Sequence, residues 1–285
     1  SLLAIVDRGE EVLIPDPAWP NYEMMLKVQG AIPKRYELLP ERNFTPDVTK
    51  LDRLVTEKTK AIMINSPGNP TGAVYDKNTL KEIIKFAKRH DLYVISDEVY
   101  DEIVFEEEHV CVKNLDEDDR VVSIYSFSKS YAMTGWRVGY AIASEEIIGL
   151  MTRLIEPVVS CAPSFAQKAA EVALKESDNF LIEMRDHYKK RRDNAFAILE
   201  KNNVRAYKPK GTFYMLIDMS STNIPSDKIA FKLLEEEKVS VGPGTTFGET
   251  TKDMIRISLA TEESELLEGV QRICDFIKKY EQSNL

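Results

Sequence analysis

The sequence predicts an α/β protein in which a mostly parallel sheet is flanked by helices and is followed by a smaller α+β domain. Over the first half of the chain, short apolar runs alternate with amphipathic stretches, the pattern of strands connected by helices. A long helical stretch then runs from Glu145 to about Asn203, and strand and helix patterns alternate again beyond it. We expect a boundary near residue 170, which separates a large domain over 1–170 from a small C-terminal domain over 171–285.

The elements of the large domain follow from apolar runs that end at polar or turn residues. Strands are expected at 12–15, 32–36, 61–64, 92–96, 121–125 and 137–143. Helices are expected at 22–28, from 46 or 47 to 55, and up to His90 from Asp76, a residue type that favours the N-cap.

The elements beyond residue 144 are helical first and mixed afterwards. We expect the long helical stretch to be interrupted at Pro157 and Pro163, because proline has no amide hydrogen to donate within a helix. The small domain should contain strands at 212–217, 239–241 and 254–259, and helices at 226–236 and 262–280.

Composition and charge indicate an ordinary globular enzyme. With 285 residues, 43% of them hydrophobic and 30% charged, the chain is long enough for a sizeable core. The net charge of -9 argues against a nucleic-acid partner, and no apolar run approaches the length of a membrane span. The acidic runs 106–108 and 116–119 are expected to be solvated loops.

The cysteines and histidines suggest neither disulfides nor a metal site. Three scattered cysteines form no disulfide framework, which fits a reducing compartment, and we expect the protein in the cytoplasm. The three histidines show no paired spacing with other metal ligands. These residues are Cys111, Cys161, Cys274, His90, His109 and His187.

The stretch Ser126-Phe127-Ser128-Lys129-Ser130, with Arg137 eight residues after the lysine, carries the most chemistry. A lysine can form a Schiff base with an aldehyde cofactor. Serine hydroxyls and a guanidinium group are natural ligands of a phosphate. Taken alone, the same stretch also fits a surface turn with an ordinary lysine.

Three further motifs accompany Lys129 in a fixed order. The first is Asn69-Pro70-Thr71-Gly72, the second Asp97-Glu98-Val99-Tyr100, and the third Arg256-Ile257-Ser258. Each is weak alone, but the four together closely resemble the class I/II aminotransferases, which are enzymes of fold type I that depend on pyridoxal 5'-phosphate (PLP). The resemblance extends over the whole chain and implies the PLP-dependent transferase fold.

The resemblance implies roles for individual residues. Lys129 would hold PLP as a Schiff base, Asp97 would keep the pyridine nitrogen protonated, and Tyr100 and Asn69 would bind the 3'-oxygen of the ring. Trp19 would stack on the ring and, with Asn69, line the substrate pocket. Ser126, Ser128 and Arg137 would hold the phosphate, and Arg256 would bind the substrate carboxylate.

Several of these residues also have a simpler interpretation. Asp97 fits a cap of the following turn, and Trp19 fits a core or rim aromatic. Tyr22 fits helix packing as easily as a site role. Strand alternation alone allows Arg256 on an outer face, whereas an inward arginine must be paired. The segment 242–248 superficially resembles a dinucleotide-binding fingerprint, but its third glycine comes one residue late, and we expect a loop near the active site.

The expected activity is the transfer of an amino group between an L-amino acid and a 2-oxo acid, with Lys129 as general base and acid. The substrates would be the small-molecule partners, and the resemblance implies a homodimer without metal. The alternatives are another PLP reaction on the same scaffold, such as a β-lyase or a cyclopropane-forming synthase, or a catalytically incomplete fragment.

The first residues predict that the chain is truncated. Ser1 to Val6 have the pattern of the end of an apolar-faced helix without a cap. Members of the resembling family carry a further segment before this point, which binds the cofactor phosphate and shapes the side-chain pocket. The substrate amino acid is therefore left open by the sequence.

Overall fold

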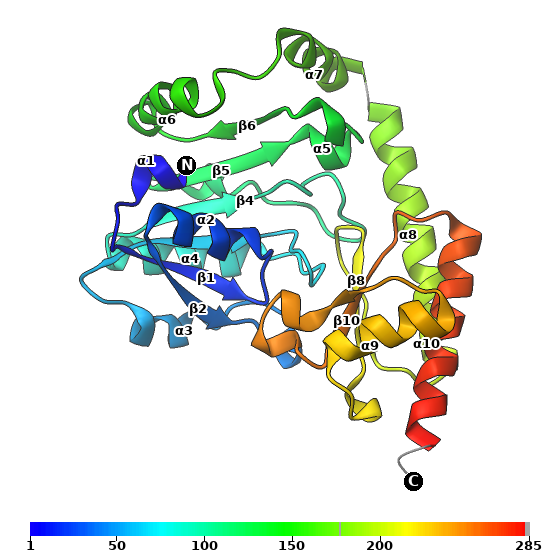
Figure 1. The fold of residues 1–285 in the computed structure, drawn as a ribbon. Coiled ribbons are helices and arrows are strands. Elements are labelled where there is room, and N and C mark those ends of the chain that lie inside the picture. Colours follow the sequence, from blue (N-terminus) through cyan, green and yellow to red (C-terminus); the bar gives the residue numbers. More distant parts are fainter. Residues whose placement is uncertain (177, 283–285) are drawn as a thin grey trace.

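The computed structural model describes residues 1–176 and 178–282, in which ten strands form two sheets. Residue 177, within the predicted long helical stretch, and residues 283–285, at the end of the predicted small domain, lie outside the described residues. The second sheet, with α9 and α10, lies beside the carboxyl ends of the first sheet (Figure 1). The chain therefore brings two separately built sheets against one another.

The first sheet has six strands in the order β2-β1-β3-β4-β5-β6. All neighbouring pairs are parallel except β5 and β6, which are antiparallel. This confirms the expected mostly parallel sheet. Its strands are β1 (Glu11–Asp16), β2 (Ile32–Glu37), β3 (Thr59–Asn65), β4 (Tyr93–Asp97), β5 (Val121–Ser126) and β6 (Gly139–Ile142).

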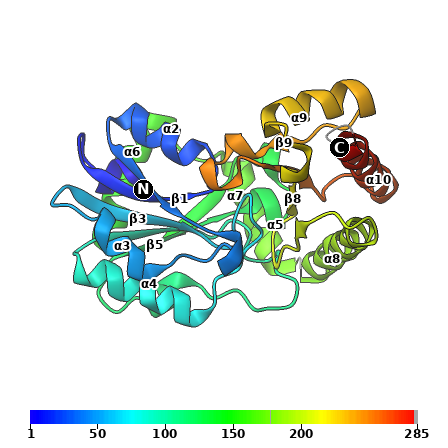
Figure 2. The ribbon, with the colours of Figure 1, turned by 90° about the horizontal axis from the view of Figure 1, so that it is seen from below.

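Helices cover both faces of the first sheet, and Figure 2 shows α2 and α6 on one side with α3 and α4 on the other. Each face has its own apolar cluster, one built around α4 and the other around α1, α2 and the start of α6. No helix in 1–176 or 178–282 is long and apolar enough to cross a membrane. The helices of this part are α1 (Leu2–Ile5), α2 (Asn21–Gln29), α3 (Val48–Leu51), α4 (Lys77–Arg89), α5 (Phe127–Ser130), α6 (Glu145–Val159) and α7 (Ser164–Glu176).

The second sheet is antiparallel, in the order β7-β8-β10-β9, and packs on helices with a third apolar cluster. The strands are β7 (Ala206–Tyr207), β8 (Tyr214–Asp218), β9 (Gly242–Pro243) and β10 (Met254–Ser258). The helices are α8 (Asp178–Lys201), α9 (Ser226–Lys232) and α10 (Glu263–Gln282).

Most element boundaries differ from expectation by a few residues, and two predictions are wrong. Helix α6 continues through Pro157 to Val159. Proline removes one backbone bond, and the helix ends only two residues later, so the loss falls on its last turn. The strand expected at 239–241 is found instead at β9, because Gly242 and Pro243 are the residues that pair with β10.

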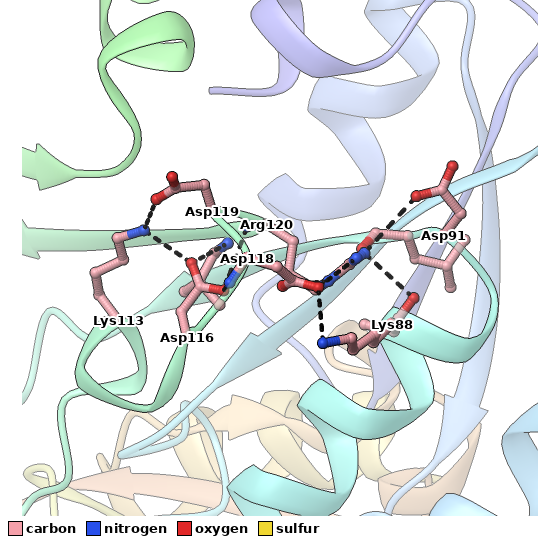
Figure 3. A network of polar contacts seen from close by, with 10 residues as sticks. Lys88, Asp91, Lys113, Asp116, Asp118, Asp119 and Arg120 are labelled. Atoms are coloured by element: carbon pink, nitrogen blue, oxygen red, sulfur yellow. Dashed lines mark hydrogen bonds and ion pairs between the residues drawn. The ribbon is translucent and has the colours of Figure 1, made fainter.

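The acidic run 116–119 lies in a loop with Glu117, Asp118 and Asp119 exposed, as expected, but three of its carboxylates are also paired. Lys113 Nζ lies 2.8 Å from Asp116 Oδ2 and 2.9 Å from Asp119 Oδ1 (Figure 3). Arg120 Nε donates to Asp118 Oδ1 over 2.8 Å, and the Asp116 side chain is fully buried. This network fixes the turn that enters β5, the strand that leads to Lys129.

The acidic run 106–108 is also paired where it meets α8. Arg192, only 1% exposed, donates from its Nη1 to Glu106 Oε2 over 2.8 Å and to the Pro209 carbonyl over 2.9 Å. Lys210 pairs with Glu107. These ion pairs tie the loop after β4 to α8 and to the segment that enters β8.

Candidate active site

A cavity of about 350 Å³ lies at the carboxyl ends of the parallel strands, where open α/β sheets bind ligands. Every residue predicted to bind the cofactor lines this cavity. The predicted residues are Trp19, Asn69, Asp97, Tyr100, Ser126, Ser128, Lys129 and Arg137, and they are joined by Tyr22, Asn65, Val99, Thr134 and Tyr214.

Lys129 lies in the single turn of α5, directly after β5. The Ser126 hydroxyl oxygen caps this turn by accepting from the Ser128 amide over 3.1 Å. The lysine is half-buried, with Nζ 5.8 Å from the centre of the Tyr100 ring and 5.6 Å from that of Phe213. An amine between two ring faces is held within the cavity rather than in bulk solvent.

Asp97 is the last residue of β4 and is buried. Its Oδ2 accepts a hydrogen bond from the Tyr22 hydroxyl, and its Oδ1 accepts from the Val99 amide over 3.3 Å. The Asn65 amide also donates to the Asp97 carbonyl over 2.9 Å. Burial raises the pKa of Asp97, so a cation placed in the cavity would favour its ionised form.

Arg256 reaches the edge of the same site from β10 of the second sheet. Its Nη1 donates to Asn69 Oδ1 over 2.8 Å, and its Cζ lies 4.0 Å from the Tyr214 ring centre and 4.6 Å from that of Phe247. Among the described residues, its buried Nε has no hydrogen-bond partner. Burial lowers the pKa of Arg256, which nevertheless remains cationic at neutral pH.

Asn69 and Tyr100 are both oriented by neighbours. The backbone amide of Asn69 donates to Asn65 Oδ1 over 2.8 Å. The side-chain oxygen of Asn69 accepts from Arg256, which leaves the Asn69 NH₂ group as the donor for a ligand. The Tyr100 hydroxyl contacts that of Tyr214 over 3.5 Å, and burial raises the pKa of Tyr100.

Arg137 lines the cavity, and its backbone has a left-handed conformation with φ of 53°. Its Nη1 donates to the Thr134 carbonyl over 2.9 Å, and the side chain is exposed. The strand expected to begin at Arg137 begins at Gly139, because the left-handed residue turns the chain before β6 starts.

Four polar or aromatic residues of the cavity lie outside the predicted set. Tyr22 contacts Trp19 edge-on, with ring centres 5.6 Å apart. The packing interpretation of Tyr22 is correct, since the residue is buried in α2, but its hydroxyl also reaches Asp97. Asn65 and Thr134 stand beside the recognised motifs and were therefore within reach of sequence reasoning. Tyr214 belongs to no motif that the sequence singled out.

The family comparison agrees with this arrangement. The model of the family described as Aminotransferase class I and II matches residues 1–273 of this chain. The chain belongs to this family. It is an aminotransferase by descent. Its relatives in Thermotoga maritima and Pyrococcus abyssi are named as aspartate aminotransferases and one in Thermococcus litoralis as an aromatic-amino-acid aminotransferase, which favours amino transfer over the β-lyase and synthase alternatives.

Individual relatives resemble this aminotransferase closely. The putative aminotransferase YugH of Bacillus subtilis is 38% identical over 98% of this chain and 72% of its own length. The solved aromatic aminotransferase of Pyrococcus horikoshii is 38% identical with a TM-score of 0.94, over 98% of this chain and 76% of that one. The aspartate aminotransferase of Thermus thermophilus, solved with maleate, is 35% identical with a TM-score of 0.91, over 95% and 71% of the two chains.

Proposed function

We propose that this aminotransferase uses PLP, held by Lys129, to transfer an amino group between an L-amino acid and a 2-oxo acid. One observation carries the proposal: Lys129, Asp97 and Arg137 line a single cavity, and Arg256 borders it from the other sheet. An amine, a buried carboxylate and two guanidinium groups are the set that an aldehyde, a ring nitrogen, a phosphate and a substrate carboxylate require.

The donor set fits PLP. Among the described residues, no cation is in hydrogen-bond contact with the buried Asp97 carboxylate, so a protonated ring nitrogen would offset the desolvation that raises the pKa of Asp97. Lys129 Nζ would bind the aldehyde carbon, Trp19 would cover the ring, and Tyr100 and Asn69 would donate to its 3'-oxygen. Ser126, Ser128 and Arg137 would hold the phosphate. When bound, the ring supplies an electron sink for the pair left at the substrate Cα.

The remaining chemistry belongs to this chain. Lys129 Nζ would remove the proton from the substrate Cα as a general base. As a general acid, it would then donate that proton to the carbon that came from the cofactor's aldehyde. Its aromatic neighbours Tyr100 and Phe213 lie beside that amine and would shield part of it from water. Asp97 would keep the ring nitrogen charged while the proton moves, and Tyr22 would hold Asp97 in place.

Arg256 would orient the substrate. Its Nε, which has no hydrogen-bond partner in the part of the chain that the structure describes, lies on the edge of the guanidinium group that binds a carboxylate in two parallel hydrogen bonds. With the carboxylate fixed there, the Cα–H bond is set relative to Lys129, and orientation of this kind lowers the barrier substantially. The named substrates of the relatives, aspartate and aromatic amino acids, both carry the α-carboxylate that this role requires.

The same proposal includes the organisation of the protein. We assign residues 1–170 to a PLP-binding domain and 171–285 to a small domain that supplies Arg256. The family resemblance supports a homodimer, and the scattered cysteines support a cytoplasmic location.

The test is chemical capture of the lysine. The purified protein is incubated with PLP, reduced with borohydride and digested, and the modified peptide is identified by mass spectrometry. We expect the label on Lys129 and its loss in Lys129→Arg, while exposed lysines such as Lys168 stay unlabelled. A folded protein that takes up no label on Lys129 would contradict the proposal and would favour a catalytically incomplete chain.

A further inference from the structure

We propose that Asp16 and Phe247 are positioning residues for Arg256. Asp16, at the end of β1, holds the loop of residues 247–250 in place. We call Asp16 and this loop together the Asp16 latch. The latch presses the Phe247 ring against Arg256 and so presents the guanidinium to a substrate carboxylate. This inference rests on the proposed role of Arg256.

The carboxylate of Asp16 is the fixed point of the latch. It is only 6% exposed and accepts three hydrogen bonds from the loop. Its Oδ1 accepts from the Thr250 amide over 3.2 Å and from the Thr250 hydroxyl over 2.8 Å, while its Oδ2 accepts from the Glu249 amide over 3.2 Å. Hydrogen bonds to an ionised acceptor are stronger than neutral ones, so this single side chain holds two consecutive loop residues.

The loop backbone is held a second time at Phe247. Its carbonyl accepts from the Ala18 amide over 2.9 Å and from Arg35 Nη1 over 3.2 Å. The same Arg35 Nη1 lies 3.6 Å from Asp16 Oδ2. A Cβ atom on Gly248 would lie 2.0 Å from Asp16 Oδ1, so the contact requires glycine at that position. The latch therefore joins β1, β2 and the loop of the second sheet at one place.

The side chain of Phe247 carries this fixation to Arg256. The ring is buried, and its centre lies 4.6 Å from the guanidinium carbon. Gly242 lies directly beside both side chains, since a Cβ there would make ordinary contacts of 3.5 Å with the Phe247 ring and 3.7 Å with Arg256 Nε. Together with Tyr214, the ring restricts where the guanidinium can lie. If the loop moves, Arg256 loses one of the two aromatic contacts that orient it.

The latch makes no polar contact with Lys129, Asp97 or Arg137 within the described part of the chain. Its polar contacts involve Asp16, Ala18, Arg35 and the loop, and it approaches the proposed cofactor site only through Ala18, which precedes Trp19. Loosening it should therefore weaken carboxylate binding and leave PLP retention intact. A merely structural contact would lower stability without that separation.

The test uses Asp16→Asn and Phe247→Leu, with Glu11→Gln as the matched control. Glu11 is a second buried carboxylate on β1, at the opposite end of the strand, and it accepts from the Thr56 and Thr59 hydroxyls and pairs with Lys34 over 3.1 Å. The PLP-loaded proteins are titrated with maleate and 3-phenylpropionate, two unreactive carboxylates, while PLP content and thermal midpoint are measured in parallel.

We expect both latch variants to raise the dissociation constant of the tighter-binding carboxylate at least fivefold with PLP content unchanged. Glu11→Gln should lower the thermal midpoint and leave that constant within twofold. If Asp16→Asn and Phe247→Leu both bind carboxylate as the wild type does, the latch proposal is wrong. Arg256→Lys separates the two proposals: if it too binds normally, the role of Arg256 fails and the latch fails with it, whereas weakened binding in Arg256→Lys alone overturns only the latch.

Discussion

The hydroxyl of Tyr22 donates a hydrogen bond to Asp97 Oδ2 and thereby joins helix α2 to the end of β4 inside the candidate cavity. Burial, followed by the Asp97 charge, raises the pKa of Tyr22 well above its ordinary value, so the hydroxyl remains a donor at neutral pH. A donated hydrogen bond favours the ionised form of a carboxylate. Tyr22 therefore keeps Asp97 ready for a cationic partner.

Tyr22→Phe should weaken both the fold and the retention of the cofactor. Loss of a buried hydrogen bond to a carboxylate should lower the free energy of unfolding by about 1–3 kcal/mol. It should also raise the pKa of Asp97 and the dissociation constant of PLP. Urea unfolding of the PLP-free protein and a PLP titration measure the two effects. An unchanged PLP affinity would assign Tyr22 to packing alone.

Arg256→Lys should impair substrate binding rather than cofactor binding. Lysine keeps the charge but not the planar fork that binds a carboxylate through two parallel hydrogen bonds. We expect KM for the amino acid to rise by about 10- to 100-fold, the equivalent of about 1.4–2.8 kcal/mol, with labelling of Lys129 by PLP unaffected. Steady-state kinetics across amino-acid concentrations provide the measurement, and a KM equal to that of the wild type would remove Arg256 from the site.

Asp101→Asn should change how stability depends on pH. Burial, followed by the charge of Glu102, raises the pKa of Asp101 to about 6 from an ordinary 3.8. Between these values the folded chain holds a proton that the unfolded chain has released, so this group lowers stability as pH rises through the window. Denaturant unfolding at pH 4 and pH 7 should show the wild type losing roughly 2 kcal/mol relative to the variant. A constant difference between the two proteins would mean that Asp101 does not titrate there.

Gly72→Ala should destabilise the turn that presents Asn69. Gly72 has φ of 66°, and a Cβ there would lie 2.2 Å from Pro209 Cβ, while its carbonyl accepts from the Lys210 and Gly211 amides. Strain and overlap together should cost roughly 2–4 kcal/mol in the free energy of unfolding. Gly149→Ala in α6, where a Cβ meets nothing within 4 Å, is the control and should be neutral or stabilising. Equal effects of the two substitutions would contradict the argument.

The sequence was sufficient for the parts of the fold and site that local patterns determine. Apolar runs predicted the strands of the first sheet, and the motifs around Asn69, Asp97 and Lys129 predicted residues that do line one cavity. Each of these motifs lies at or shortly after the carboxyl end of a parallel strand. Because those strands are neighbours in the sheet, the motifs come together in space.

Contacts between distant segments were not predictable in the same way. The hydrogen bond from Tyr22 to Asp97 spans 75 positions, and those between Asp16 and the loop of residues 247–250 span more than 230, so no local pattern encodes them. The ion-pair partners of the exposed acidic runs were not predictable for a related reason. Glu106 has its partner in Arg192 of α8, and an ion pair of that kind appears only when the two sheets are brought together. Pro157 shows that a helix tolerates proline where few bonds remain to be lost.

The most direct test of the central claim follows the amino group itself. The PLP-loaded protein is incubated with ¹⁵N-labelled aspartate or phenylalanine and with unlabelled 2-oxoglutarate, and the products are separated by mass spectrometry. The account predicts ¹⁵N in glutamate, an equal amount of the 2-oxo acid of the donor, and no transfer by Lys129→Ala. Turnover that releases free ammonia, or transfer that persists in Lys129→Ala, would contradict it.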